Sequence, residues 1–128
     1  MESIRRFAAE QDIGFATISG IGALREAEVG YFVWDNRQYA RRTLRGPYEL
    51  VSVTGSVCRI DGEPFVHAHV ALGDGDYRMW GGHLFEATVS LVAELHFAAT
   101  EEPVERVVAD FCGLPLLDLP DDGTPPAS

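Results

Sequence analysis

The sequence predicts an α+β fold, with a mainly antiparallel β-sheet and one or two short helices. Two observations lead to this prediction. Runs rich in β-branched and aromatic residues recur along the 128-residue chain, and turns that contain glycine or aspartate separate them. A helical spacing of apolar residues appears near the two ends, at residues 3–11 and 104–111.

The first elements are expected to be a helix at residues 3–11 and a short strand from Phe15 to Ser19. A glycine-rich turn at Gly20 and Gly22 is expected to end that strand. The same stretch superficially resembles a dinucleotide-binding loop, but Arg25 stands where the third glycine of G-x-G-x-x-G belongs. A dinucleotide site is therefore not predicted.

A β-hairpin is expected next, with its turn at Asp35 and Asn36. Gly46 and Pro47 are expected to break the chain after it. Two further strands follow in "YELVSVTGSVCRI" and "PFVHAHVAL", with a turn at residues 61–63 between them. The next turn, "GDGD", leads into the long β-rich run "FEATVSLVAELHFAAT".

The C-terminal part is expected to hold the second helix. Apolar residues stand at positions i, i+3, i+4 and i+7 of residues 104–111, and Gly113 is suited to end a helix there. These residues are Val104, Val107, Val108 and Phe111. We expect a single domain over residues 1–119 and a disordered polar, proline-containing tail over residues 120–128.

The charge of the chain weighs against nucleic-acid binding. There are ten Lys plus Arg residues, all arginine, against twenty Asp plus Glu, a formal net charge of −10. Such a domain repels a phosphate backbone at long range. Four arginines nevertheless cluster in "DNRQYARRTLRG": Arg37, Arg41, Arg42 and Arg45. They form either an anion- or DNA-binding patch or a strand face whose arginines pair with the surplus carboxylates, and charge runs favour the second interpretation.

The sequence is expected to belong to a cytoplasmic protein with no membrane association. It contains no apolar run of about 18 residues. Its N-terminal stretch "MESIRRFAAEQD" lacks the apolar core of an export signal. Cys58 and Cys112 are too few and too far apart for a disulfide framework, so both are expected to be reduced, packed thiols.

Three of the four histidines fall within residues 65–87: His67, His69 and His83. His67 and His69 are two apart on a predicted strand, so they project from the same face, while the intervening apolar residues face the core. His83 follows after the "GDGD" turn and the Gly81–Gly82 pair, and a strand that pairs back would bring it to the other two. The glycines would allow a close backbone approach or a positive φ.

Three neutral imidazoles suit Zn²⁺ and leave a fourth coordination position for water or substrate. The alternative is that these histidines are polar residues on a half-exposed sheet face or are hydrogen-bonded at a subunit interface. His96 has no such neighbours in the sequence and is expected to be structural.

Four ordered blocks of the sequence resemble the plants-and-prokaryotes-conserved (PPC) domain. They are "SGIGALREAEVGYF", "GPYELVSVTGSV", "DGEPFVHAHVALGD" and "GGHLFEATV", and the closing "GLPLLDL" fits as well. The resemblance runs from about Gly14 to Leu119. It implies a major antiparallel sheet and a homotrimeric assembly.

The resemblance also bears on function. In plants the domain accompanies AT-hook DNA-binding motifs, and stand-alone bacterial members are often labelled as candidate DNA-binding proteins. Its fold is similar to that of acetolactate decarboxylase, an enzyme whose zinc is held by an H-x-H pair and a later histidine. By that likeness His67, His69 and His83 are the expected zinc ligands. The chain departs from the family in having no AT-hook "RGRP". It also starts at the predicted helix, where bacterial relatives usually carry an earlier strand.

Three functions are therefore open at the level of sequence. The first is a trimeric zinc-binding domain with a small-molecule ligand and lyase- or hydrolase-like chemistry. The second is a DNA-associated regulator that uses the arginine cluster. The third is a trimeric protein-interaction module without catalysis.

Overall fold

The computed structural model describes residues 1–119, so the tail expected at residues 120–128 lies outside the described part. One helix and six strands follow one another along the chain. They are α1 (Glu2–Glu10), β1 (Phe15–Val33), β2 (Gln38–Ile60), β3 (Glu63–Gly73), β4 (Met79–Thr100), β5 (Arg106–Ala109) and β6 (Leu114–Leu117). The helix predicted at residues 3–11 is confirmed to within one residue at each end.

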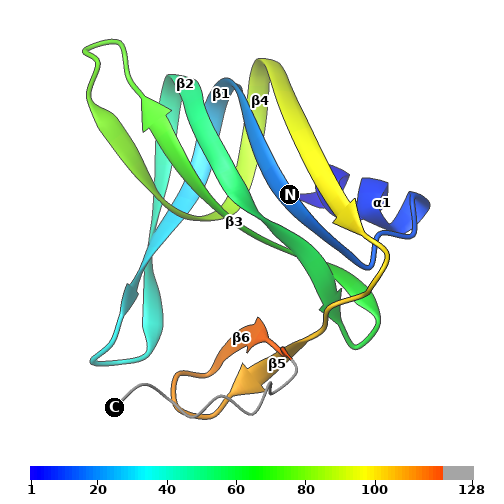
Figure 1. Cartoon of the computed structure of the whole chain (residues 1–128). Helices are drawn as coiled ribbons and strands as arrows, with labels where there is room; N and C mark the ends of the chain where they lie inside the picture. The colour runs from blue at the N-terminus through cyan, green and yellow to red at the C-terminus, as the bar shows by residue number, and fades with distance from the viewer. Residues whose placement is uncertain (120–128) are drawn as a thin grey trace, which may run out of the picture.

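The four long strands close on one another in the order β1-β2-β3-β4. β1 pairs with β2 and with β4, β3 also pairs with both, and every pairing is antiparallel. Figure 1 shows these strands strongly bent, with α1 beside one end of the sheet and the small β5–β6 hairpin below it. The predicted fold class, mainly antiparallel sheet with little helix, is confirmed.

The core lies on one face of this closed sheet. Leu24, Leu50 and Leu72 are among its buried side chains, and the side chains of Val53 and Val70 pack with them. A smaller cluster forms where Ala8 of α1 packs against Ile18, Val57 and Val66. Val66, Ala68 and Val70 are buried, as predicted. Because side chains alternate along a strand, His67 and His69 take the opposite face.

β1 does not end at Gly20, so the predicted glycine-rich turn is wrong. The strand continues to Val33, and Gly20 pairs with Val53 on one side and Leu95 on the other. A Cβ atom at Gly20 would lie 2.4 Å from the carbonyl oxygen of Glu94. The glycine therefore serves a close approach of two strands rather than a turn.

Gly46 and Pro47 do not break the chain as predicted; both lie within β2. The pairing with β1 shifts there, since Leu24 pairs with Tyr48 whereas Glu26 pairs with Arg45. Such a β-bulge tolerates a proline, because the residue that it adds makes no regular ladder hydrogen bond. The strand bends at this point and continues.

Residues 104–111 do not form the predicted helix. Residues 106–109 form β5, which pairs with β6. Val107, Val108 and Phe111, three of the four residues of the helical pattern, are more than half exposed. The helical spacing of these apolar residues therefore does not correspond to a helix that buries one apolar face. β-branched valines favour the extended backbone that pairing with Leu114–Leu117 provides.

The turns between the long strands follow the predictions more closely. Residues 34–37 form the turn of the β1–β2 hairpin, where Asn36 Oδ1 accepts a hydrogen bond from the Gln38 amide at 3.1 Å. Asp61 and Gly62 form the β2–β3 turn, both with positive φ. None of the helices within residues 1–119 is long and apolar enough to cross a membrane.

Candidate metal centre

The structure brings together the three histidines that the sequence singled out. His67 and His69 lie on β3 and His83 on β4. The ring centroids are 5.3 Å apart for His67 and His69, 5.1 Å for His67 and His83, and 5.4 Å for His69 and His83. One nitrogen from each ring lies within 4.8 Å of the other two. We refer to these residues as the histidine triad.

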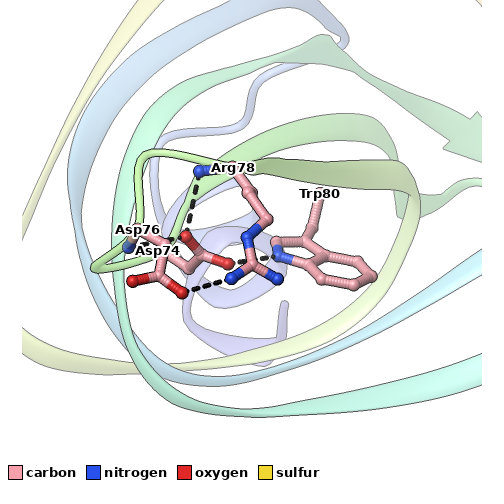
Figure 2. A network of polar contacts seen from close by, with 4 residues as sticks. All are labelled: Asp74, Asp76, Arg78 and Trp80. Atoms are coloured by element: carbon pink, nitrogen blue, oxygen red, sulfur yellow. Dashed lines mark hydrogen bonds and ion pairs between the residues drawn. The ribbon is translucent and has the colours of Figure 1, made fainter.

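The β3–β4 turn sets the register that forms the triad. Its centre is Asp74, whose Oδ1 accepts hydrogen bonds from the backbone amides of Asp76 and Arg78, each at 2.9 Å. Its Oδ2 accepts from the indole Nε1 of Trp80 at 3.0 Å. The Asp76 carboxylate also pairs with the Arg78 guanidinium, and Figure 2 shows the whole network. With the turn fixed, His69 pairs directly with His83.

The glycines before His83 have the role that the sequence suggested. Gly82 has a φ of +149°, and a Cβ atom there would lie 2.7 Å from the carbonyl oxygen of Gly30 on β1. A side chain at this position would be strained and would push β4 away from β1. The glycine therefore lets His83 reach its place beside the other two histidines.

The environment of the triad favours the neutral form of two imidazoles, those of His67 and His83. Burial lowers the pKa of His83 most, and the neighbouring charges of His67, His69, Arg41 and Arg106 add to this effect in that order, so that the pKa falls to about 4. Burial, then Arg106 and His69, also lower the pKa of His67. A neutral imidazole has a free lone pair, which is the form that binds a metal ion.

One nitrogen of the triad has no partner. Nδ1 of His83 is buried and lacks a hydrogen bond within the described residues. The faces of the ring are packed instead, with the centroids of Tyr39 and Phe85 at 4.8 and 4.7 Å. Leaving a buried polar atom unpaired is costly, so an atom of this kind calls for an unseen partner such as an ion or water.

These residues fit a zinc ion. With Zn–N bonds of about 2.0–2.1 Å in a tetrahedral site, ligand nitrogens stand about 3.3 Å apart. The triad nitrogens, within 4.8 Å of one another, need to close by no more than about 1.5 Å. Side-chain rotation about χ1 and χ2 covers such a movement. The histidine triad offers three ligands and leaves a fourth coordination position free.

Arg106 is a residue of this centre that the sequence pattern did not single out. It lies on β5, is 8% exposed, and its Nη2 lies 3.2 Å from Nδ1 of His67. Its Nε donates to Sγ of Cys58 at 3.0 Å. In the helix expected at residues 104–111, Arg106 is not one of the four apolar positions and had no assigned role. It reaches the centre because its segment is a strand beside β2, where Glu105 forms a bridge with Arg59.

Cys58 and Cys112 are free and buried, as predicted. Glu86, three residues beyond His83 in the sequence, is engaged elsewhere. The Glu86 carboxylate pairs with the N-terminal ammonium of Met1. Within residues 1–119 no carboxylate forms a hydrogen bond or ion pair with a triad imidazole, and His96 is not part of the group.

The arginine cluster does not form a single free patch. Arg41 pairs with Glu28 at 3.5 Å, and Arg45 pairs with Glu26 at 2.9 Å, both across the β1–β2 pairing. The guanidinium of Arg42 lies 5.4 Å from the ring centroid of Trp80. Arg37 lies in the hairpin turn with a φ of +54°, so it does not share the strand face as expected.

Comparisons with known proteins agree with this fold. The chain matches a protein from Pyrococcus horikoshii described as a plant- and prokaryote-conserved (PPC) protein, at 40% identity and a TM-score of 0.85, over 94% of this chain and 83% of that one. It also matches a metal-containing protein from Archaeoglobus fulgidus at 37% identity and a TM-score of 0.83, over 92% and 84%.

A third solved structure, described as a putative DNA-binding protein from Ralstonia eutropha JMP134, matches at 29% identity and a TM-score of 0.87, over 93% and 83%. A search of curated proteins gave no match. The sequence profile of the Plants and Prokaryotes Conserved domain, abbreviated PCC, matches residues 1–101, which include the whole triad. By this match the chain belongs to the Plants and Prokaryotes Conserved (PCC) domain family.

Proposed function

We propose that the protein binds one Zn²⁺ ion per chain through His67, His69 and His83. The observation that carries this proposal is the convergence of three imidazoles, one of which has a buried, unpartnered Nδ1. The metal-containing relative from Archaeoglobus fulgidus supports it. A purely structural role for the histidines would leave that Nδ1 unexplained.

The triad supplies three ligands, so the fourth position is available to a small molecule. Zinc bound there would supply Lewis acidity to a carbonyl or carboxyl group of that ligand. The chain's own residues hold the neutral imidazoles in place and pack Tyr39 and Phe85 against His83. We propose metal-dependent chemistry of the lyase or hydrolase type on such a ligand.

The test is metal content by elemental mass spectrometry on tag-free protein grown and purified with zinc available. His83→Ala removes one ligand, and His96→Ala is the matched control, because His96 is an exposed histidine of the same strand outside the triad. We expect near-stoichiometric zinc in the wild type and in His96→Ala, and little in His83→Ala. Absence of zinc from the wild type would refute the proposal.

We further propose a homotrimer, as the family resemblance implies, and a cytoplasmic location. Several large apolar side chains of β1, β2 and β4 are more than half exposed or nearly so: Ile21, Val51, Leu91 and Val92. A contiguous apolar patch of this kind commonly marks a subunit interface. The two free, buried cysteines suit a reducing compartment. Native mass spectrometry tests the assembly, with Leu91→Glu expected to dissociate it and a monomeric wild type contradicting it.

DNA binding is the second candidate, because some similar structures carry that description. The pairing of Arg41 with Glu28 and of Arg45 with Glu26 leaves little free positive charge for phosphates. Fluorescence anisotropy with duplex DNA at low salt tests it. Binding that weakens with added salt and with Arg41→Gln would favour this function, and no binding would leave the metal centre or a protein-interaction role.

A further inference from the structure

Arg106 is a buried cation among neutral partners. It is 8% exposed. Beyond Cys58 and His67, its Nη1 donates to the carbonyl oxygen of Pro115 at 2.8 Å and its Nη2 lies 3.4 Å from Oγ of Ser56. None of these four groups carries a formal negative charge. The guanidinium is thus held firmly in place without a counter-ion.

Other arginines of the described chain have a carboxylate partner, although most of them are far more exposed than Arg106. Five arginines form ion pairs with carboxylates within residues 1–119: Arg6, Arg41, Arg45, Arg59 and Arg78. Arg106, the most buried charged residue, forms none in that part of the chain. Burying a charge is expensive unless an opposite charge accompanies it. The chain has twenty Asp and Glu residues, so a shortage of carboxylates does not explain why Arg106 forms no ion pair within residues 1–119.

Cys58 does not supply the missing charge. Its Sγ accepts from Arg106, but burial raises the pKa of the thiol, and this effect outweighs the lowering by the Arg106 hydrogen bond and charge. The group therefore stays a neutral thiol near neutral pH. A further source of negative charge has to come from outside the described chain.

The unpaired cation lies next to the histidine triad. A guanidinium can only donate hydrogen bonds, so in the metal-free chain the 3.2 Å contact directs an N–H group of Arg106 at the lone pair on Nδ1 of His67. A neutral imidazole has only one such lone pair, so zinc binding to this ring would displace the contact and release the N–H group. Four acceptors occupy the five N–H groups of Arg106, which leaves one available. Arg41, whose guanidinium lies 3.6 Å from the Phe85 ring centroid, adds positive charge near His83.

We propose that this centre binds a small oxyanion, of the carboxylate or phosphate type, and that Arg106 selects for its negative charge. The proposal rests on the metal centre proposed above, since zinc would add two positive charges to a site that lacks any carboxylate within residues 1–119. An anion bound there would offset part of the positive charge of both the metal and the buried guanidinium. Neutral ligands of the same size would leave the charge of Arg106 uncompensated.

The charge of Arg106 has opposite effects on the two ligands. It repels a zinc ion at the triad and attracts an oxyanion there. Arg106→Gln is therefore expected to tighten zinc binding by about tenfold and to weaken anion binding by about tenfold or more. A merely structural role for Arg106 would make the variant bind both ligands less tightly. The sign of the two changes thus separates a selective role from a structural one.

The experiment measures both affinities on the full chain. Zinc affinity is measured by competition with a chromophoric chelator. Binding of acetate and of inorganic phosphate is measured by calorimetry on zinc-loaded and on metal-free protein, with chloride holding the ionic strength constant. Arg6→Gln removes the same charge from the surface of α1, where Arg6 pairs with Glu10, and serves as the matched control with no effect on either affinity.

Tighter zinc and weaker anion binding in Arg106→Gln support the proposal, and the anion that binds more tightly identifies the ligand type. Zinc binding without any anion binding overturns it and leaves the metal centre intact. Anion binding to metal-free protein that Arg106→Gln abolishes supports it even if zinc never binds. If neither zinc nor an anion binds, both proposals are wrong. If Arg106→Gln fails to fold, Arg106→Lys keeps the charge but not the contacts. An anion affinity close to that of the wild type in this variant supports the role of the charge, and a loss as large as the one expected for Arg106→Gln overturns it.

Discussion

His69 on β3 lies directly opposite His83 on β4, and their ring centroids are 5.4 Å apart. The two residues come from strands joined by a single turn, so the register of that turn decides whether the triad forms. A slip by one residue would turn His83 to the core face, because side chains alternate along a strand. The candidate metal centre therefore depends on the turn as much as on its ligands.

Asp74→Ala is expected to lower the thermal midpoint and weaken zinc binding, because it removes the acceptor for two amides and the Trp80 indole. Calorimetry and chelator competition measure the two effects. Asp76→Asn is the control, since the Asp76 side chain pairs only with the exposed Arg78 and is expected to change little. If both variants bind zinc like the wild type, the turn does not set the register.

Gly82→Ala is expected to destabilise the protein by about 1–3 kcal/mol, because alanine is strained at positive φ. The new Cβ atom would also meet the Gly30 carbonyl oxygen at 2.7 Å. Urea unfolding measures the loss, and zinc affinity is expected to fall with it as His83 moves. Gly75→Ala is the control, as nothing lies within 4 Å of a Cβ atom there. Equal stability of the two variants would contradict the prediction.

The stability of the metal-free protein is expected to decline as the pH falls from 6.5 to about 4. The pKa of His83 is lowered from 6.5 to about 4 in the folded state. In this window the unfolded chain binds a proton that the folded chain does not, so acid favours unfolding. Because the imidazole is only half-buried, solvent screening reduces the contribution to about 1–2 kcal/mol.

Urea titrations between pH 7 and pH 4.5 measure this decline. His83→Gln removes the titrating group, so its stability should depend less steeply on pH than that of the wild type. The pKa of Asp74 is lowered, chiefly by the Trp80 hydrogen bond, so the turn carboxylate is expected to stay ionised over most of this range. Parallel curves for the wild type and His83→Gln would show that His83 is not the group responsible.

Zinc is expected to stabilise the folded chain, because the triad exists only after β3 and β4 pair. At a free zinc concentration 100 times the dissociation constant, the free energy of unfolding should rise by about 2.7 kcal/mol. Removal of zinc by a chelator should reverse the gain. His83→Ala should show no such dependence on zinc, whereas His96→Ala should behave like the wild type. An unfolding midpoint that does not change with zinc concentration would argue against the triad as a binding site.

The local parts of this fold could be predicted from the sequence. Alternation placed Val66, Ala68 and Val70 on the core face and hence His67 and His69 on the other. The "GDGD" turn predicted that β4 returns alongside β3, which brings His83 to them. Each of these inferences depends on residues within a few positions of one another, where periodicity and turn chemistry are informative.

Long-range packing could not be predicted in the same way. The local sequence around Gly20 predicts a turn. A glycine is needed there because the backbone of Glu94 on β4 approaches closely. Pro47 predicts the end of a strand, but a β-bulge in the pairing of β2 with β1 accommodates the proline. Arg106 belongs to a segment that was expected to be helical, whereas three of its contacts are with residues about 40–50 positions earlier in the chain. These features depend on contacts with residues that are distant in the sequence, and a local sequence pattern does not identify such residues.

The position of Arg106 in the chain has a consequence for how relatives are compared. The family profile covers residues 1–101 and so includes the three histidines but not β5. Two proteins that match the profile equally well can therefore share the metal ligands and differ in the cation beside them. If Arg106 selects the ligand as proposed, sorting such proteins by the segment that follows the profile, rather than by the profile itself, would group them by the charge of that ligand.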